Sequence, residues 1–445
     1  MSPADTPPPA VPAAPSLGAA CRYWLKLGFI SFGGPAGQIA LMHQELVERR
    51  RWISEQRFLH ALNYCMLLPG PEATQLAIYI AWLLHGMVGG VIAGVLFFLP
   101  GFAMLSLLSA LYLSFGDVPL VQGLFAGIKP AVVAVVLFAA WRIGSRAIRN
   151  RLLAAIAALA FIGIFCRIDF PWIVLAAGLA GAVGGRLAPA QFSHSSAHAA
   201  SARAHGPALL DDDVPPPAHA RFSRNRLALT LLVFVAIWAA AMFAASGSGT
   251  LVDMGVFFTK AAFLTIGGAY AVLPYVYQGA VEHFGWLSGP QMMDGLALGE
   301  TTPGPLIMVV TWVGYLGGVA AGSSTPTAGL VGAATATFFT FLPSFMFILA
   351  GAPLVEATRG DLKFTAPLTG ITAAVVGVIL NLAVFFAWHA FWPHAGPGAP
   401  FAGPFAWPSL LLAIAAFFAL WKYKIDVTKV IAVCALLGLA LSAVR

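Results

Sequence analysis

The sequence is short of charge. Asp, Glu, Lys and Arg make up only 9% of its 445 residues, whereas hydrophobic residues make up 60%. One soluble core cannot hide that much apolar surface, so the composition excludes a soluble globular protein. Apolar segments close to the roughly 20 residues that a helix needs to cross a bilayer recur along the whole chain. The composition therefore predicts an all-α polytopic membrane protein.

Cysteine and the common catalytic motifs are also scarce. The four cysteines show no CxxC spacing, which argues against a disulfide framework or a zinc site. No HExxH, GxSxG or Walker glycine loop occurs, so we expect no enzyme, no cofactor and no metal. The net charge of +7 comes from Arg and Lys in short loops, where it reports membrane topology. We therefore expect no nucleic-acid partner.

Two polar stretches divide the chain. Residues 1–16 are rich in Pro and Ala without a basic region, which predicts a disordered tail rather than a cleaved signal peptide. Residues 189–226 are rich in Pro, Ser, Asp and His, which predicts a disordered cytoplasmic linker. The first half is then 17–188 and the second 227–445, which opens with an extra span at 227–245.

The two halves repeat one another. Shifting the sequence by 234 positions places residues 260–305 on residues 26–71 without a gap and gives 13 identities in 46 columns, where roughly 3 are expected by chance. Pro69-Gly70-Pro71 then coincides with Pro303-Gly304-Pro305. Further on, FLPGF (98–102) coincides with FLPSF (341–345) at an offset of 243. The chain is a duplicated unit, and its helix breakers belong to that unit.

Loop charge predicts how the halves lie in the membrane. With the N-terminus inside, the arginine-rich loops after about 141 and 185 and the lysines near 422–429 all face the cytoplasm. This gives about 13 membrane segments and two inverted-topology repeats, a frequent plan in secondary transporters. The arginines of 43–57 fit only if 17–42 and 58–84 are re-entrant hairpins. We favour hairpins and keep simple spans as the alternative.

Broken helices predict an anion site. Unwound backbone in a bilayer is tolerated only where it is buried in protein or lines a watery cavity. The freed N–H groups and helix N-termini carry partial positive charge, which attracts an anion. Two such breaks in each half would surround one central cavity, so the sequence favours an anion pathway. Close packing and kinks are the alternative role of the same glycines and prolines.

Polar residues near the breaks are the candidate ligands. Lys26 and Lys260 precede the two glycine pairs, and Lys129 lies in an apolar segment, although a lysine near a segment end can instead reach the interface. Glu72 and Glu300 are not equivalent by the repeat, so one can carry a proton while the other orients backbone. Thr301 and Thr302 accompany Glu300, and Asn63 and Gln38 are weaker candidates.

These motifs resemble a known family. FGGP, IALMHQELVERRRWIS and LLPGPEATQLAIY, with the second copy ALGETTPGPLIMVVTWVGY, are similar to the chromate ion transporter family in its long two-domain form. The resemblance implies a bacterial inner-membrane protein that exports chromate, driven by the proton-motive force, and gives chromate resistance. It implies functional roles for the motif positions Gly33, Gly34, Pro35, Pro69, Gly70, Pro71, Thr74, Gln75, Gly267, Gly268, Glu300, Pro303, Gly304 and Pro305. Glu72 falls at a position that varies in the family.

The expected mechanism is alternating access around a midplane site. The expected partners are chromate or a sulfate-like dianion and the lipid bilayer, with protons as coupling ion and a homodimer left open. Charge and size do not separate chromate from other tetrahedral oxyanions. A passive anion channel and a membrane scaffold that does not transport remain the alternative functions.

Overall fold

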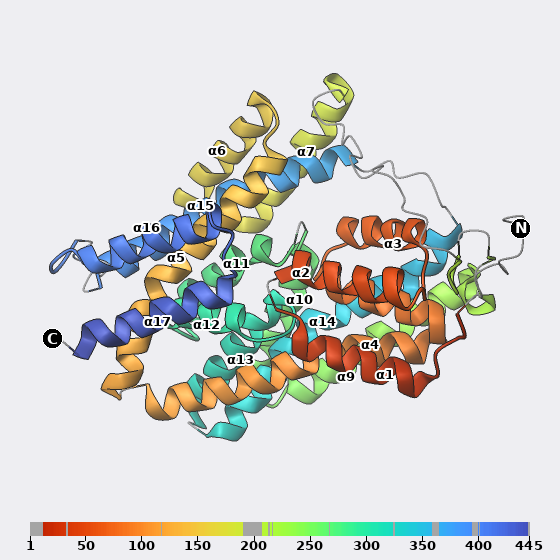
Figure 1. Ribbon diagram of the computed structural model, residues 1–445, viewed down its shortest axis with the longest axis horizontal. Helices are drawn as coiled ribbons and strands as arrows, with labels where there is room; N and C mark the ends of the chain where they lie inside the picture. The colour runs from red at the N-terminus through yellow and green to blue at the C-terminus, as the bar shows by residue number, and fades with distance from the viewer. Residues whose placement is uncertain are drawn as a thin grey trace, which may run out of the picture.

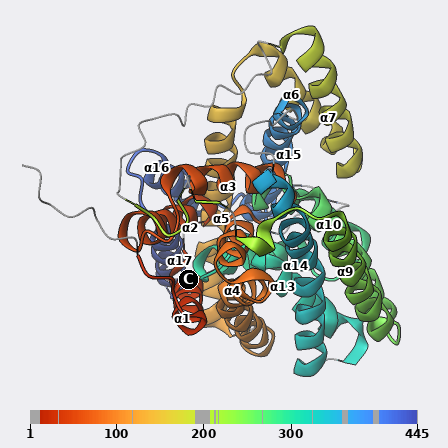
Figure 2. The ribbon, with the colours of Figure 1, turned by 90° about the vertical axis from the view of Figure 1, so that its right-hand side faces the viewer.

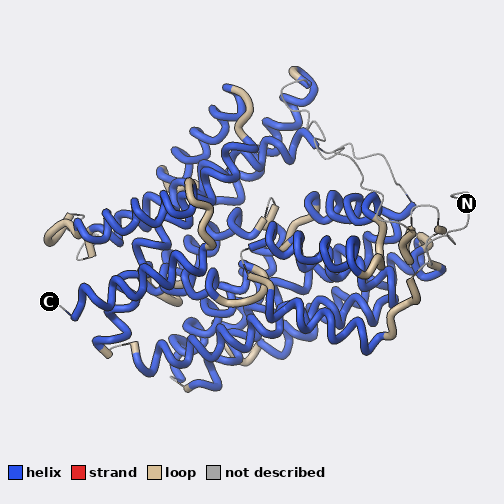
Figure 3. Tube along the Cα trace, viewed as in Figure 1, coloured by secondary structure: helices blue, strands red, loops and turns tan. Residues whose placement is uncertain are grey.

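The chain is helical throughout the part that the structure describes. A computed structural model describes residues 12–32, 34–116, 118–189, 207–211, 214–215, 217–266, 268–323, 325–357, 365–393, 399 and 401–443. Within these ranges there is no strand, and Ile53 and Leu210 form an isolated bridge (Figure 3). The all-α prediction is confirmed for these residues.

Among the described residues, six helices are long and apolar enough to cross a membrane. They are α4 (Glu72–Phe115), α5 (Pro119–Ala147), α7 (Phe170–Leu187), α9 (Arg224–Ala245), α14 (Pro326–Ala357) and α15 (Thr365–Phe391). Shorter apolar helices are α6 (Arg151–Phe165), α16 (Trp407–Trp421) and α17 (Val427–Ala443). Large apolar side chains such as Leu232 and Phe243 on α9 are exposed, as expected of side chains that face lipid. These features are those of a polytopic membrane protein.

Glycine and proline interrupt the remaining segments where the sequence predicts. In the first half, α1 (Leu17–Ile30) is followed by α2 (Gly34–His43), the π-helical turn η1 (Gln44–Arg49), α3 (Glu55–Leu67) and then α4. The second half repeats this order with α10 (Gly249–Leu264), α11 (Ala269–Tyr277), η3 (Gln278–His283), α12 (Gly289–Thr301), η4 (Leu306–Met308), α13 (Val309–Gly318) and η5 (Val319–Ser323). Each Pro-Gly-Pro lies between two helices, because proline lacks the N–H that would continue the first.

The broken segments fold back on themselves. Tyr23, in α1, packs edge-on against Trp52, which follows η1, with ring centroids 5.7 Å apart. The equivalent residues of the second half, Phe257 and Trp286, pack in the same way at 5.6 Å. The chain must therefore reverse direction between the two members of each pair. Each copy of the repeat thus begins with a helical hairpin, α1–α2 in the first half and α10–α11 in the second.

The later helices are exchanged between the halves. Helix α5 packs against α16 and α17, and its counterpart α15 packs against α6 and α7 (Figures 1 and 2). The backbones touch at glycines: a Cβ on Gly127 would collide with the carbonyl of Cys434, and one on Gly370 with the carbonyl of Ala177. Such small-residue contacts are typical of helix packing in membranes. Each half therefore completes the fold of the other.

Part of the predicted linker is docked. Residues 1–11 of the predicted tail and 190–206 of the linker lie outside the described residues. Beyond them, the N–H groups of Leu209 and Leu210 donate to the carbonyls of Arg51 and Trp52 at 2.9 and 3.0 Å. The Leu210 side chain is buried, which stabilises this contact. Residues 209 and 210 of the predicted linker 189–226 therefore pair with the backbone that follows η1.

Candidate functional site

The two halves meet at their helix breaks. We call residues 69–71 the first tip and 303–305 the second tip. Residues 31 and 32 are the first break, and residues 265, 266 and 268 are the second break. The N–H of Gly70 donates to the carbonyl of Thr265 at 2.8 Å, and the N–H of Gly304 donates to the carbonyl of Ser31 at 2.9 Å. Ser31 and Thr265 are 234 positions apart, as are Gly70 and Gly304. Each tip therefore binds the break of the other half.

The tip glycines are required by backbone geometry. Gly70 and Gly304 have φ angles of +127° and +108°, where a side chain is strained. A Cβ on Gly70 would also collide with Ser344 and Gln75. At the second tip, a Cβ on Gly101 would lie 2.6 Å from the carbonyl oxygen of Pro303. Gly101 and Ser344 belong to the repeated FLPGF and FLPSF motifs, which therefore pack on the tips.

Two buried glutamines hold the tips. The Gln75 amide donates to the carbonyl of Pro69 at 2.7 Å, and the Gln38 amide donates to the carbonyl of Gly304 at 2.7 Å. Sequence reasoning ranked Gln38 as a weaker candidate, and the structure places it at the second tip. Asn63, the other weak candidate, is exposed.

Several buried polar atoms around the tips have no hydrogen-bond partner among the described residues. They are the free amide oxygens of Gln38 and Gln75 and the hydroxyls of Ser31, Thr74 and Ser344. All five side chains are fully buried. Buried polar groups are normally satisfied, so unpaired ones indicate a place for water or a ligand.

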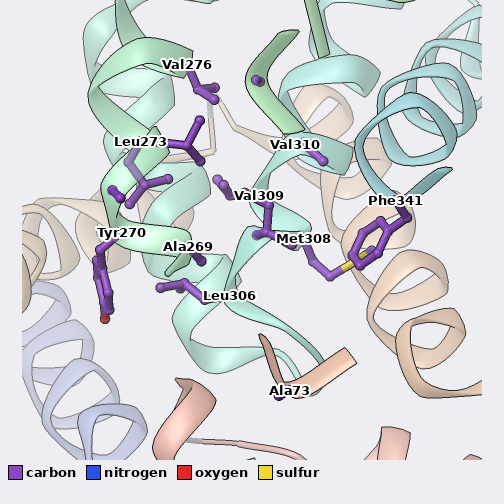
Figure 4. Close-up of a cluster of buried hydrophobic side chains, with 14 of the residues drawn as sticks. Ala73, Ala269, Tyr270, Leu273, Val276, Leu306, Met308, Val309, Val310 and Phe341 are labelled. Atoms are coloured by element: carbon purple, nitrogen blue, oxygen red, sulfur yellow. The ribbon is translucent and has the colours of Figure 1, made fainter. Parts of the chain in front are cut away.

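Four helices begin at these tips and breaks. They are α2 at Gly34, α4 at Glu72, α11 at Ala269, and α13 through its lead-in η4 at Leu306. Figure 4 shows the first turns of three of them, at Ala73, Ala269 and Leu306, beside one apolar cluster. Helix N-termini carry partial positive charge, so this arrangement favours an anion. Of the predicted motif residues, Gly33 and Gly267 lie outside the described residues.

Two carboxylates lie beside the second break. Glu300, buried in α12, accepts a hydrogen bond from the hydroxyl of Tyr270 in α11. Glu72 begins α4, and its carboxylate lies against Gly268. Arg142 of α5 is close enough to interact electrostatically with both carboxylates. Sequence reasoning assigned Arg142 to a loop and missed it here.

The threonines beside Glu300 have a local role. Thr301 and Thr302 donate to the carbonyls of Leu298 and Gly299 at 3.0 and 3.2 Å. Their hydroxyls therefore close the end of α12, which satisfies carbonyls that the helix leaves free.

The three predicted lysines do not gather at the tips. Lys26 and Lys260 have exposed side chains on α1 and α10, so neither belongs to the buried polar cluster. The reason is helical geometry, because the buried face of α1 is occupied by Trp24, Leu27 and Gly28. Lys129 is partly buried and interacts electrostatically with Asp294 of α12, whose carboxylate accepts from the Tyr112 hydroxyl at 2.9 Å.

A buried ion pair joins the halves elsewhere. The Arg57 guanidinium of α3 lies 2.8 Å from the Glu356 carboxylate of α14, and each side chain is 1% exposed. The Tyr79 hydroxyl donates to the other Glu356 oxygen at 2.5 Å. Sequence reasoning counted Arg57 only as a loop charge. The detectable signal was an isolated acid at the end of a long apolar segment.

The fold and the tips define a class of protein, a duplicated helical membrane protein whose halves interlock through broken helices. The chain belongs to the chromate transporter family, whose sequence profile matches residues 19–182 and 252–439. It is 34% identical to the chromate transport protein of Pseudomonas aeruginosa, over 98% of this chain and 94% of that protein.

More distant relatives cover most of the chain too. Identity is 29% to the chromate transport protein of Cupriavidus metallidurans, over 94% of this chain and 91% of that protein. It is 25% to the probable chromate transport protein of Synechococcus elongatus, over 95% of each. No solved structure matches the chain.

Proposed function

We propose that this protein is a secondary transporter that exports chromate, or a sulfate-like dianion, across the bacterial inner membrane and so gives chromate resistance. The observation that carries the proposal is the pair of reciprocal hydrogen bonds, Gly70 to Thr265 and Gly304 to Ser31, which bring four helix N-termini to one place. A dianion suits such a site because the partial charges are fixed and need no counter-ion. The substrate is inferred from the family and the relatives' names.

Alternating access follows from the duplication. The two tips contact the opposite half through equivalent positions, so a second state can exchange the roles of the halves. In our proposal the halves are inverted repeats with about 13 segments, and the hairpins α1–α2 and α10–α11 enter from opposite faces. The edge-on pairs Tyr23–Trp52 and Phe257–Trp286 support hairpins rather than simple spans.

The membrane potential favours this direction of transport. The potential across a bacterial inner membrane is inside-negative, so it drives a dianion outward by about 2.3 kcal/mol per charge per 100 mV. A proton gradient would then add to the driving force without being required.

The test is accumulation of labelled chromate in inside-out membrane vesicles, where export appears as uptake. Sulfate is added as competitor, and the potential and the pH gradient are collapsed separately. We expect saturable uptake that sulfate inhibits and that falls when the potential is collapsed. Uptake that rises linearly with concentration and shows no counterflow would favour a channel. Uptake equal to that of empty vesicles, with the folded protein present, would remove chromate as substrate.

A further inference from the structure

Glu72 occupies an unusual place. It is the first residue of α4, directly after the first tip. Its two carboxylate oxygens lie 3.4 and 3.8 Å from the Cβ position of Gly268, the residue that caps the N-terminus of α11. One of these oxygens is buried and has no hydrogen-bond partner among the described residues. A carboxylate therefore already lies where the N-terminus of α11 would attract an anion.

The equivalent place in the other half holds no carboxylate. The repeat offset of 234 places Leu306 at the position of Glu72 and Gly34 at the position of Gly268. No atom of the described residues lies within 4 Å of the Cβ position of Gly34. The space at the N-terminus of α11 is therefore occupied by a carboxylate, whereas the equivalent space at the N-terminus of α2 is open.

A second observation marks the site beside Glu72 as polar. The unpaired hydroxyls of Thr74 and Ser344 and the unpaired amide oxygen of Gln75 are fully buried around the first tip. Ser344 and Gln75 lie against the Cβ position of Gly70, two residues before Glu72. The surroundings thus offer hydroxyl groups to a bound oxyanion in addition to the helix N-terminus.

Few charged groups of the described residues act on Glu72. Arg142 of α5 interacts electrostatically with Glu72, and the Cys65 thiol of α3 is close enough to sense its charge. Glu300, hydrogen-bonded to Tyr270, shares Arg142. Arg142 is thus the cation that acts on both carboxylates. A dianion placed beside an ionised Glu72 would be repelled strongly in this dry environment.

We propose that Glu72 is a built-in competitor of the substrate, so that an oxyanion binds at the N-terminus of α11 only after the Glu72 carboxylate takes up a proton or moves away. This inference rests on the proposed function and concerns how pH controls the access of the oxyanion to its site. The assignment concerns this chain. Proton uptake by Glu72 leaves a neutral carboxylic acid that can donate a hydrogen bond to the oxyanion.

The experiment measures binding of labelled sulfate to the purified full-length protein in lipid nanodiscs, from mildly acidic to mildly alkaline pH. For the wild type we expect affinity to fall as pH rises. Glu72→Gln keeps the shape without the charge, so it should bind sulfate about tenfold more tightly at alkaline pH, as expected for about 1.4 kcal/mol of repulsion. Its affinity should also lose most of the pH dependence.

Two further variants keep the assignment falsifiable. Glu282→Gln removes one negative charge from η3, away from the tips, and should behave as the wild type. Leu306→Glu places a carboxylate at the equivalent position of the other half and should weaken sulfate binding at alkaline pH. An unchanged pH dependence in Glu72→Gln, with sulfate still bound, would overturn only the role of Glu72. Failure of the wild type to bind sulfate or chromate at any pH would overturn the proposed function as well.

Discussion

The first and second tips share a backbone and differ in the side chains around them. Both place a glycine with positive φ between two prolines and donate its N–H to the opposite half. Both glutamines that hold them, Gln38 and Gln75, come from the first half, and the equivalent residues of the second half are Val272 and Val309. Both halves therefore keep the broken helices, but only the first half supplies the glutamine side chains that donate hydrogen bonds to the tips.

The helix before each tip, α3 or α12, contacts a long helix of the other half, and these two contacts also differ. Helix α3 is joined to α14 by the buried Arg57–Glu356 ion pair, whereas its counterpart α12 is joined to α4 by a hydrogen bond from the Tyr112 hydroxyl to the Asp294 carboxylate. In an alternating-access cycle both contacts must open and close in turn. The ion pair also contacts the docked part of the linker, since Arg57 donates a hydrogen bond to the carbonyl of Asp211 at 3.2 Å. The stronger of the two contacts therefore lies at the end of the molecule where the linker packs. We infer that this end is the more firmly closed one.

The largest loss of stability is expected when the Arg57–Glu356 ion pair is broken. Arg57→Leu leaves Glu356 buried without its cation and should lower the free energy of unfolding by about 3–5 kcal/mol. The measurement is unfolding in mixed detergent micelles. The double variant Arg57→Leu/Glu356→Leu should regain most of this loss. In the second half, Gln291→Leu alters the position equivalent to Arg57 and should cost only about 1 kcal/mol, through its capping contact with Ser288. Equal losses in the two halves would contradict the comparison.

Substitutions of the two tip glycines should have the next largest effect. Gly70→Leu and Gly304→Leu both place a side chain at positive φ, which costs about 1–3 kcal/mol, and both should abolish transport in vesicles while the protein still inserts. Gly70→Leu should destabilise more, because its Cβ collides with Ser344 and Gln75, whereas the nearest atom to a Cβ on Gly304 is 3.6 Å away. Normal transport by both variants at equal expression would show that the tips are not the site.

Replacing each glutamine by the valine of the other half tests the polar support. Gln38→Val removes the hydrogen bond to Gly304 and Gln75→Val removes the one to Pro69, each leaving a buried carbonyl unpaired at a cost of about 1–2 kcal/mol. We expect chromate uptake to fall several-fold in each variant. Asn63→Val, at an exposed position of α3, serves as the control and should transport normally. Full activity of both glutamine variants would mean that the valines of the second half support a tip equally well.

The smallest effect is expected at the weaker contact. Tyr112→Phe removes only the hydroxyl that donates to Asp294, so the unfolding free energy should fall by about 1 kcal/mol. Tyr79→Phe, at the ion pair, should cost more, because its hydroxyl donates to a fully buried carboxylate. The two variants can be compared by thermal unfolding in the same detergent. A larger loss for Tyr112→Phe would reverse the order of the two contacts.

Much of the architecture was predictable because it depends on local signals. The low content of charged residues predicted a membrane protein. The repeated Pro-Gly-Pro predicted where α3 and α12 end, since proline cannot continue a helix. The positions 234 apart also predicted which residues would share surroundings. The docked part of the linker was not predictable, because its contact with Arg51 and Trp52 depends on backbone pairing that composition does not reveal.

The candidate site was predictable in part. Glycines, prolines and Gln75 were found because they repeat or follow a motif. Arg142, Tyr270, Ser344 and the Arg57–Glu356 pair were missed, because each contributes through a partner more than 20 residues distant in sequence. Lys26 and Lys260 were proposed because they repeat, yet repetition also preserves residues on the exposed face of a helix.

The sequence by itself determined that this chain is a duplicated, helical membrane protein with breaks at fixed positions, because hydrophobicity, glycine and proline act locally on the backbone. It also determined that the two halves would be chemically unequal. In the second half, Leu306 occupies the position equivalent to Glu72, and valines occupy the positions equivalent to the two glutamines. Only the tertiary structure decided that each tip binds the other half's break and that Glu72 lies against Gly268. Those contacts join distant segments, and packing rather than local propensity selects them.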